Sequence, residues 1–157
     1  MKKIIKETIP YLVIILVVVL IRLFVVTPVR VDGESMSPTF KNNQILLLNK
    51  MDKSYKRFDV VVFNHNNNKL VKRIIGLPGD IVSYKNNKLY VNDKLVKESY
   101  KRKDTDDFTS DIVPSDMYFV LGDNRSNSLD SRYIGFISKS DIEGVVNFSI
   151  IPIKKVK

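Results

Sequence analysis

The chain has 157 residues, enough for one compact domain and a short additional segment. It has no cysteine and one histidine, which excludes disulfides, a cysteine nucleophile and thiolate or histidine-based metal sites. The net charge is +9, of which residues 1–30 supply +4 (five Lys/Arg, one acid) and the rest +5 (21 Lys/Arg, 16 acids). The chain has no basic stripe with interleaved aromatic residues and no known nucleic-acid-binding motif, so the positive charge does not indicate nucleic-acid binding. Attraction to anionic lipid headgroups explains the excess of positive charge at least as well.

The first predicted element is an apolar helix. Residues 9–26, IPYLVIILVVVLIRLFVV, carry the single charge of Arg22, and 18 residues are about the minimum that spans a hydrocarbon core. Arg22 lies near the end, where its side chain can reach the interface. Three lysines in the first six residues favour a cytoplasmic N-terminus. We expect a cytoplasmic tail over 1–8, a transmembrane helix over 9–26 and an extracytoplasmic domain over 27–157.

A cleaved secretory signal is the alternative interpretation of this run. Such a signal has a shorter apolar region that ends at a small-x-small site. The chain contains no alanine, and FVVTPVR (24–30) offers no such site. Gly33-x-Ser35 has the spacing but lies too far along the chain. The pattern therefore favours a retained anchor in the cell membrane.

The rest of the chain predicts a mostly β fold, a sandwich or barrel of short strands. Asn86-Asn87 and Asn92-Asp93 are two-residue pairs typical of hairpin turns. The charged segment 97–111 is expected to be an exposed loop. The predicted strands are 44–48, 59–63, 70–75, 80–84, 88–91, 94–96, 117–121 and 145–151.

Two serines in the turn-like segment GESMSPTF (33–40) raise the question of a nucleophile and its base. His65 lies in the polar stretch NHNNNK, and we interpret it as a solvated turn residue. A lysine can serve as the base only when it is neutral, and an ordinary lysine is only ~0.1% neutral near pH 7.4. Burial lowers a lysine pKa by up to several units. The candidate base is therefore a lysine on an apolar face.

LVKRII (70–75) supplies such a lysine. In a strand, residues 70, 72 and 74 share one face and residues 71, 73 and 75 share the other. Both faces are mostly apolar, so Lys72 or Arg73 must lie among hydrophobic neighbours. Arginine does not readily lose its proton, whereas a desolvated lysine can. The alternative is a two-sided strand whose charged ends both reach water.

GDNRSNSLDSRYIG (122–135) packs four charges and three serines into a loop after a predicted strand. One interpretation is a solvated turn held by Asp–Arg pairs. In the functional interpretation, a hydroxyl such as that of Ser128 orients the lysine while Asp130 and Arg132 fix the loop.

Together and in order, these segments resemble bacterial type I signal peptidases of the Gram-positive form. The resemblance covers nearly the whole chain and implies a β-rich catalytic domain with an extended apolar surface against the membrane. It rests on the anchor followed by SMSPT (35–39), RFDVVVF (57–63), KRIIGLPGD (72–80) and GDNRSNSLDSR (122–132).

The resemblance also implies roles for individual residues. It selects Ser35 over Ser37 as the nucleophile and Lys72 as the general base, which form a Ser–Lys dyad. The other implied roles are a hydrogen bond from Ser128 to the lysine, a structural pair of Asp130 and Arg132, and a pocket for the residue before the scissile bond lined by Met36 and Leu70.

The sequence departs from the family at two positions. Some relatives carry an oxyanion-binding serine where Gly33 stands, so here a backbone N–H would have to serve beside that of Ser35. Losing one oxyanion donor reduces the rate by ~10²-fold or more, so a compensating donor is expected. Phe58 replaces a usual glycine, which we interpret as a packing change away from the chemistry.

The implied function is that of a membrane-bound serine endopeptidase that cleaves N-terminal signal peptides from exported preproteins. Its expected partners are those signal peptides and the lipid bilayer. It needs no metal or cofactor, and a monomer is expected. One alternative is a membrane-anchored binding module without turnover, although such a module would be expected to lack the serine or the lysine. The other is a self-cleaving Ser–Lys regulator, although such regulators carry an N-terminal DNA-binding domain in place of an anchor.

Overall fold

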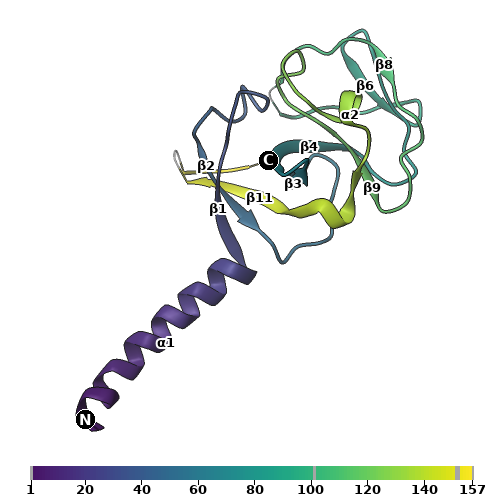
Figure 1. Ribbon diagram of the computed structural model, residues 1–157. Helices are drawn as coiled ribbons and strands as arrows, with labels where there is room; N and C mark the ends of the chain where they lie inside the picture. Colours follow the sequence, from purple (N-terminus) through teal and green to yellow (C-terminus); the bar gives the residue numbers. More distant parts are fainter. Residues whose placement is uncertain (1, 101, 151–152, 157) are drawn as a thin grey trace.

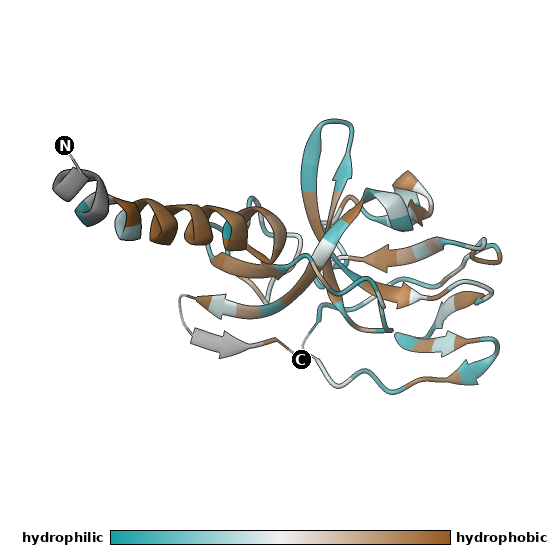
Figure 2. Cartoon of the chain, turned by 90° about the horizontal axis from the view of Figure 1, so that it is seen from below, coloured by the Kyte–Doolittle hydropathy of each residue, from teal (hydrophilic) through white to brown (hydrophobic). Residues whose placement is uncertain are grey.

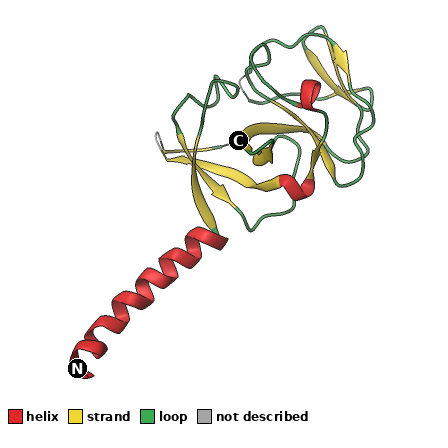
Figure 3. Ribbon diagram, in the orientation of Figure 1, coloured by secondary structure: helices red, strands yellow, loops and turns green. Residues whose placement is uncertain are grey.

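A computed structural model describes residues 2–100, 102–150 and 153–156 as one helix that leads into a β-rich domain (Figures 1 and 3). Within these residues the strands pair antiparallel throughout. The elements are α1 (Lys2–Phe24), β1 (Val26–Arg30), β2 (Ile45–Asn49), β3 (Val60–His65), β4 (Asn68–Gly76), β5 (Val82–Lys85), β6 (Lys88–Val91), β7 (Lys94–Leu95), β8 (Phe108–Thr109), β9 (Met117–Leu121), α2 (Ser131–Ile134), β10 (Ile137–Ser138), η1 (Lys139–Asp141), β11 (Ile142–Ile150) and β12 (Ile153–Lys155).

The helix α1 projects away from the β domain (Figure 1). Its segment Glu7–Phe24 is long and apolar enough to cross a membrane, and none of it is buried in the molecule. Figure 2 shows this segment as an almost continuous hydrophobic rod. The helix begins before the expected span of 9–26 and ends at Phe24, because Val26 already pairs with Asn49 as the first residue of β1.

The larger sheet has the strand order β1-β2-β11-β3-β4-β9-β10, with β12 paired to β11, and the smaller has the order β7-β6-β5-β8. The predicted mostly β fold is confirmed. Sequence reasoning missed β1, whose Pro28 argues against an interior strand; β1 lies at the sheet edge, where a missing N–H is tolerated. It also missed β8, β10 and β12, each of only two or three residues. Ile151, in the last predicted strand, lies outside the described residues.

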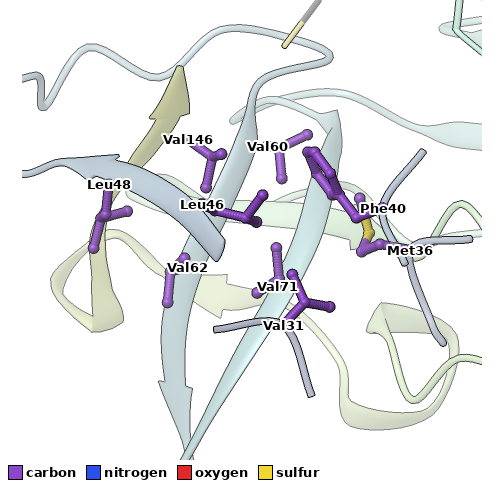
Figure 4. Close-up of a cluster of buried hydrophobic side chains, with 9 residues drawn as sticks. All are labelled: Val31, Met36, Phe40, Leu46, Leu48, Val60, Val62, Val71 and Val146. Atoms are coloured by element: carbon purple, nitrogen blue, oxygen red, sulfur yellow. The ribbon is translucent and has the colours of Figure 1, made fainter. Parts of the chain in front are cut away.

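Buried apolar side chains form three clusters that hold these sheets. One cluster joins the turn after β1 to the larger sheet (Figure 4). A second lies along β3, β4 and β9 of that sheet, and a third packs the smaller sheet against β4 and β9. The first cluster consists of Val31, Met36, Phe40, Leu46, Leu48, Val60, Val62, Val71 and Val146.

Segment 97–111 is largely the exposed loop that was expected, but Glu98 within it contributes a largely buried charge. Glu98 Oε1 accepts hydrogen bonds from the hydroxyls of Tyr84 and Tyr100, each at 2.5 Å, and from Arg125 Nη2 at 3.1 Å. Burial by itself raises the pKa of Glu98, but these hydrogen bonds hold it below its usual value. Glu98 is the exception in an otherwise largely exposed loop, because Tyr84 of β5 and Arg125 of the loop 122–135 also cover its carboxylate, and local polarity does not reveal such distant partners.

Candidate active site

Ser35 and Lys72 meet at the junction of a turn and an interior strand. Ser35 lies in the turn after β1, and Lys72 lies in β4, between β3 and β9. Lys72 Nζ donates to Ser35 Oγ at 2.8 Å and to the carbonyl oxygen of Val71 at 3.0 Å. Lys72 is only 2% exposed. A half-buried hydroxyl and a buried amine thus lie within hydrogen-bond reach of each other.

The surroundings of Lys72 favour its neutral form. Burial, the dominant cause, lowers the pKa of Lys72 from 10.5 to about 8, while the negative charges of Asp130 and Asp123 act in the opposite direction. With a pKa of about 8, a substantial share of the lysine is neutral near physiological pH. The side chain therefore meets the requirement for accepting a proton from a hydroxyl.

Arg73, on the opposite face of β4, is buried as well, at 0% exposed. Its Nε and Nη2 donate to Asp123 Oδ1 at 2.9 Å and Oδ2 at 2.7 Å. Its Nη1 donates to the carbonyl oxygen of Phe58 at 2.8 Å. The alternative of a strand whose charged ends both reach water is therefore wrong. An arginine tolerates this burial because it is paired bidentately with a carboxylate.

Removing the carboxylate of this pair is expected to destabilise the fold strongly. Breaking a buried ion pair from one side costs about 3–5 kcal/mol, because the remaining charge stays desolvated. We expect Asp123→Ala to lower the free energy of unfolding of the full chain by at least ~3 kcal/mol, measured by urea denaturation in detergent.

The matched control is Lys69→Ala, which removes a pair with Glu143 at 2.7 Å whose lysine side chain is 54% exposed. Exposed pairs contribute about 0–1 kcal/mol, so this variant should unfold almost like the parent chain. Equal destabilisation by the two variants would contradict the importance of the buried pair.

Phe58 differs from the interpretation given to it. Its φ is +75°, a left-handed conformation that glycine adopts freely and a bulky side chain rarely does. Its ring lies 5.4 Å from that of Tyr100, and its carbonyl oxygen accepts from Arg73, the neighbour of Lys72. Phe58 therefore places a bulky side chain on a left-handed backbone as well as changing the packing, and its carbonyl oxygen bonds to the residue next to the candidate base.

The backbone donors of the Ser35 turn differ in whether they are already engaged. Gly33, at φ +86°, donates its N–H to Asn42 Oδ1 at 3.0 Å, so this N–H is already engaged. The N–H of Ser37 donates to the carbonyl oxygen of Glu34 at 3.0 Å. In the described part of the chain, the Ser35 N–H donates to no protein acceptor. It is therefore available to a ligand oxygen, whereas an oxyanion role for Gly33 would require its N–H to leave Asn42.

Ser128 lies close by but does not bond to the lysine in this structure. Its Oγ is buried and has no hydrogen-bond partner among the described residues. Gly122 packs directly against it and against the Ser35 carbonyl. The expected hydrogen bond from Ser128 to Lys72 is thus not formed, although the unsatisfied hydroxyl remains the natural partner for a further donor or acceptor there.

Asp130 and Arg132 tie the following loop together. Arg132 Nε donates to Asp130 Oδ1 at 2.8 Å, and Arg132 Nη2 donates to Asp130 Oδ2 at 2.9 Å. Asp130 Oδ2 also accepts the N–H of Gly122 at 3.0 Å. Arg132 Nη2 reaches the carbonyl oxygen of Arg125 at 2.6 Å. The pair therefore fixes the segment that packs against Ser35.

Met36 and Leu70 lie in different clusters. Met36 is fully buried beside Phe40 and Val71 in the first cluster (Figure 4). Leu70 is half-buried and packs against the second cluster with Ile74. A pocket shared by the two side chains stays a prediction.

Sequence reasoning missed three residues that hold the Ser35 turn. The backbone N–H of Asn124 donates to the Ser35 carbonyl oxygen at 2.9 Å, and its Nδ2 donates to the Glu34 carbonyl oxygen at 3.2 Å. Thr39 Oγ1 donates to Asp123 Oδ2 at 2.5 Å. The only signal was the position of Asp123 and Asn124 within the polar loop 122–135.

Comparison with known proteins places this chain in a family. Residues 3–151 match the family model described as signal peptidase, peptidase S26. Signal peptidase I of Bacillus amyloliquefaciens is 44% identical over 158 residues, 91% of this chain and 85% of that protein. Signal peptidase IB of Staphylococcus aureus is 38% identical over 181 residues, 99% of this chain and 94% of that protein.

A solved structure shows the same fold. The crystal structure of a signal peptidase I from Enterococcus faecalis aligns with a TM-score of 0.54 at 40% sequence identity, covering 59% of this chain and 96% of that chain. The chain therefore belongs to the signal peptidase family of peptidases, S26, and is a serine peptidase of the signal peptidase I type.

Proposed function

We propose that this signal peptidase removes signal peptides from exported preproteins with a catalytic dyad of Ser35 and Lys72, and that α1 anchors it in the cell membrane. The observation that carries the dyad is the 2.8 Å hydrogen bond between Lys72 Nζ and Ser35 Oγ, made by a lysine that is 2% exposed. A nucleophile and a base within hydrogen-bond reach are the arrangement that activates a hydroxyl.

The chemistry begins with Lys72 in its neutral form. Lys72 Nζ accepts the proton of the Ser35 hydroxyl as Oγ attacks the carbonyl carbon of the scissile peptide bond. The tetrahedral oxyanion accepts a hydrogen bond from the Ser35 N–H and from a second donor. Lys72 then gives its proton to the leaving amine, the C–N bond breaks, and the signal peptide remains as an ester on Ser35.

The second half of the reaction uses the same lysine. Neutral Lys72 accepts a proton from a water molecule, which attacks the ester carbonyl. The proton returns to Ser35 Oγ as the C–O bond breaks, which releases the signal peptide with a free carboxylate. Both halves require only one proton acceptor and no metal or cofactor, so the chain's own side chains suffice.

The anchor would place this chemistry at the membrane surface. The three lysines before the apolar segment favour a cytoplasmic N-terminus and an extracytoplasmic domain. Nine residues separate Val26 from Ser35, a reach of at most about 30 Å. The nucleophile would therefore stay close to the bilayer, where a signal peptide that is still embedded presents its cleavage site.

The dependence of the rate on pH tests the proposed base. The pKa of Lys72 is about 8, and only the neutral form accepts a proton, so kcat/KM should rise with pH through an apparent pKa of about 8 and level off above it. The measurement is cleavage of a preprotein with an Ala-x-Ala site by the full chain in detergent, from pH 6 to 10. A rate that does not change between pH 6 and 9 would exclude a lysine base, and absence of cleavage by the parent chain would exclude the function.

A further inference from the structure

Asn124 holds both ends of the nucleophilic residue's backbone. Its N–H donates to the Ser35 carbonyl oxygen at 2.9 Å, and its side-chain Nδ2 donates to the Glu34 carbonyl oxygen at 3.2 Å. Asn124 is only 8% exposed. The Oδ1 atom of its amide accepts from Ser126 Oγ at 3.4 Å, which orients the amide with its NH₂ group toward Glu34.

The bond to Glu34 acts on the neighbouring residue through the peptide plane. The Glu34 carbonyl and the Ser35 N–H belong to the same planar peptide unit and point in opposite directions. Fixing the carbonyl therefore fixes the direction of the N–H. A donor on the carbonyl oxygen also polarises the unit, which strengthens the N–H as a donor. Within the described part of the chain, this N–H donates to no protein acceptor.

We propose that Asn124 is a positioning residue, whose side chain aims and polarises the Ser35 N–H toward the oxyanion. This inference rests on the proposed function, in which that N–H binds the oxyanion. The turn as a whole has other restraints: Thr39 bonds to Asp123, Gly33 bonds to Asn42, and the Asn124 N–H holds the Ser35 carbonyl. The Glu34 carbonyl oxygen accepts the Ser37 N–H at 3.0 Å from within the turn, and the side chain of Asn124 adds a second donor to it from the loop 122–135.

The test compares Asn124→Ala and Asn124→Leu with the parent chain in the full-length protein. Both variants keep the backbone N–H and lose only the side-chain donor, and leucine also keeps a similar volume. A misdirected donor should lower kcat for preprotein cleavage by about tenfold to a hundredfold, somewhat less than the loss of a whole oxyanion donor. The KM should stay within about twofold, because the bond forms to the oxyanion and not to the bound substrate.

Two further readouts separate positioning from a structural role. The apparent pKa of the rate should stay at that of the parent chain, because the pKa of Lys72 is set by burial and by the charges of Asp130 and Asp123, and Asn124 is uncharged. Affinity for a peptide aldehyde, which forms a tetrahedral adduct on Ser35, should fall in parallel with kcat. Asn127→Ala, in the same loop with an exposed side chain, is the control and should retain parental activity.

The outcomes distinguish this inference from the proposed function. A kcat within threefold of the parent value in both variants would overturn the role of Asn124 while leaving the dyad intact. A changed apparent pKa, a rise in KM that accounts for the loss, or unfolding of both variants at the assay temperature would likewise assign Asn124 to another role. Failure of the parent chain to cleave would instead remove the proposed function.

Discussion

Replacing Ser35 with alanine or Lys72 with methionine is expected to reduce preprotein cleavage by at least about 10⁴-fold. Each residue is required in every step in which a bond to the substrate carbonyl carbon forms or breaks, and removing either member of a nucleophile–base pair costs nearly as much as removing both. The measurement is single-turnover cleavage of a preprotein with an Ala-x-Ala site at pH 9, where the parent lysine is mostly neutral. The double variant should be no slower than the slower single variant.

Ser37→Ala is the matched control for the nucleophile. Ser37 lies two residues further along the same turn. Its backbone N–H donates to the Glu34 carbonyl oxygen, and an alanine at this position keeps that hydrogen bond. We expect this variant to cleave within a few-fold of the parent rate. Cleavage by Ser35→Ala combined with loss of activity in Ser37→Ala would reverse the assignment of the nucleophile.

The lysine variant should also be more stable than the parent chain at neutral pH, which rules out unfolding as the cause of inactivity. Burial lowers the pKa of Lys72 from 10.5 to about 8, so the buried charge destabilises the folded state relative to the unfolded state at every pH below about 8. The penalty shrinks as pH rises from 8 to 10.5 and then vanishes. Methionine avoids it, so Lys72→Met should gain up to ~3 kcal/mol at pH 7 and progressively less toward pH 10.5, as measured by urea denaturation.

The second large effect is expected at Gly122. A Cβ atom at this position would lie 2.5 Å from the Ser35 carbonyl oxygen, 2.6 Å from Ser128 Cβ and closer still to Ser128 Oγ. At least one of these groups must shift, and we expect Gly122→Ala to push the Ser35 turn away from Lys72. Because a displacement of 1 Å can cost about 10²-fold, we expect kcat/KM to fall by at least that factor.

Gly79→Ala is the control for a general effect of removing a glycine. Gly79 has φ +85° but nothing within 4 Å of a Cβ, so alanine strains the backbone without crowding. It should lower stability by roughly 1 kcal/mol and leave kcat/KM nearly unchanged. Gly122→Ala with more than a third of parental kcat/KM would show that the turn adapts, and that the contact with Gly122 does not set the geometry of Ser35 and Lys72.

Some features of the fold followed from local patterns alone. The apolar run predicted the helix within a few residues at its C-terminal end. Short β-rich runs between turn residues predicted seven of the eight strands that have four or more residues in the described part of the chain. The exception, β1, contains Pro28, and only its position at the edge of the sheet makes that proline compatible with a strand. Strands of two or three residues carry too few side chains to produce a pattern.

The sequence by itself determined the helix, the β-rich class and a lysine on a strand with two apolar faces, because these depend on neighbours in the chain. Only the tertiary structure decided that Lys72 and Arg73 are both buried, that Asp123 neutralises the arginine, and that Asn124 holds the Ser35 turn. The hydrogen bonds involved join residues 37, 50 and 84 positions apart in the Lys72–Ser35, Arg73–Asp123 and Thr39–Asp123 pairs. Such contacts depend on strand order and register, which fix which distant segments share a buried space, and no local pattern encodes them.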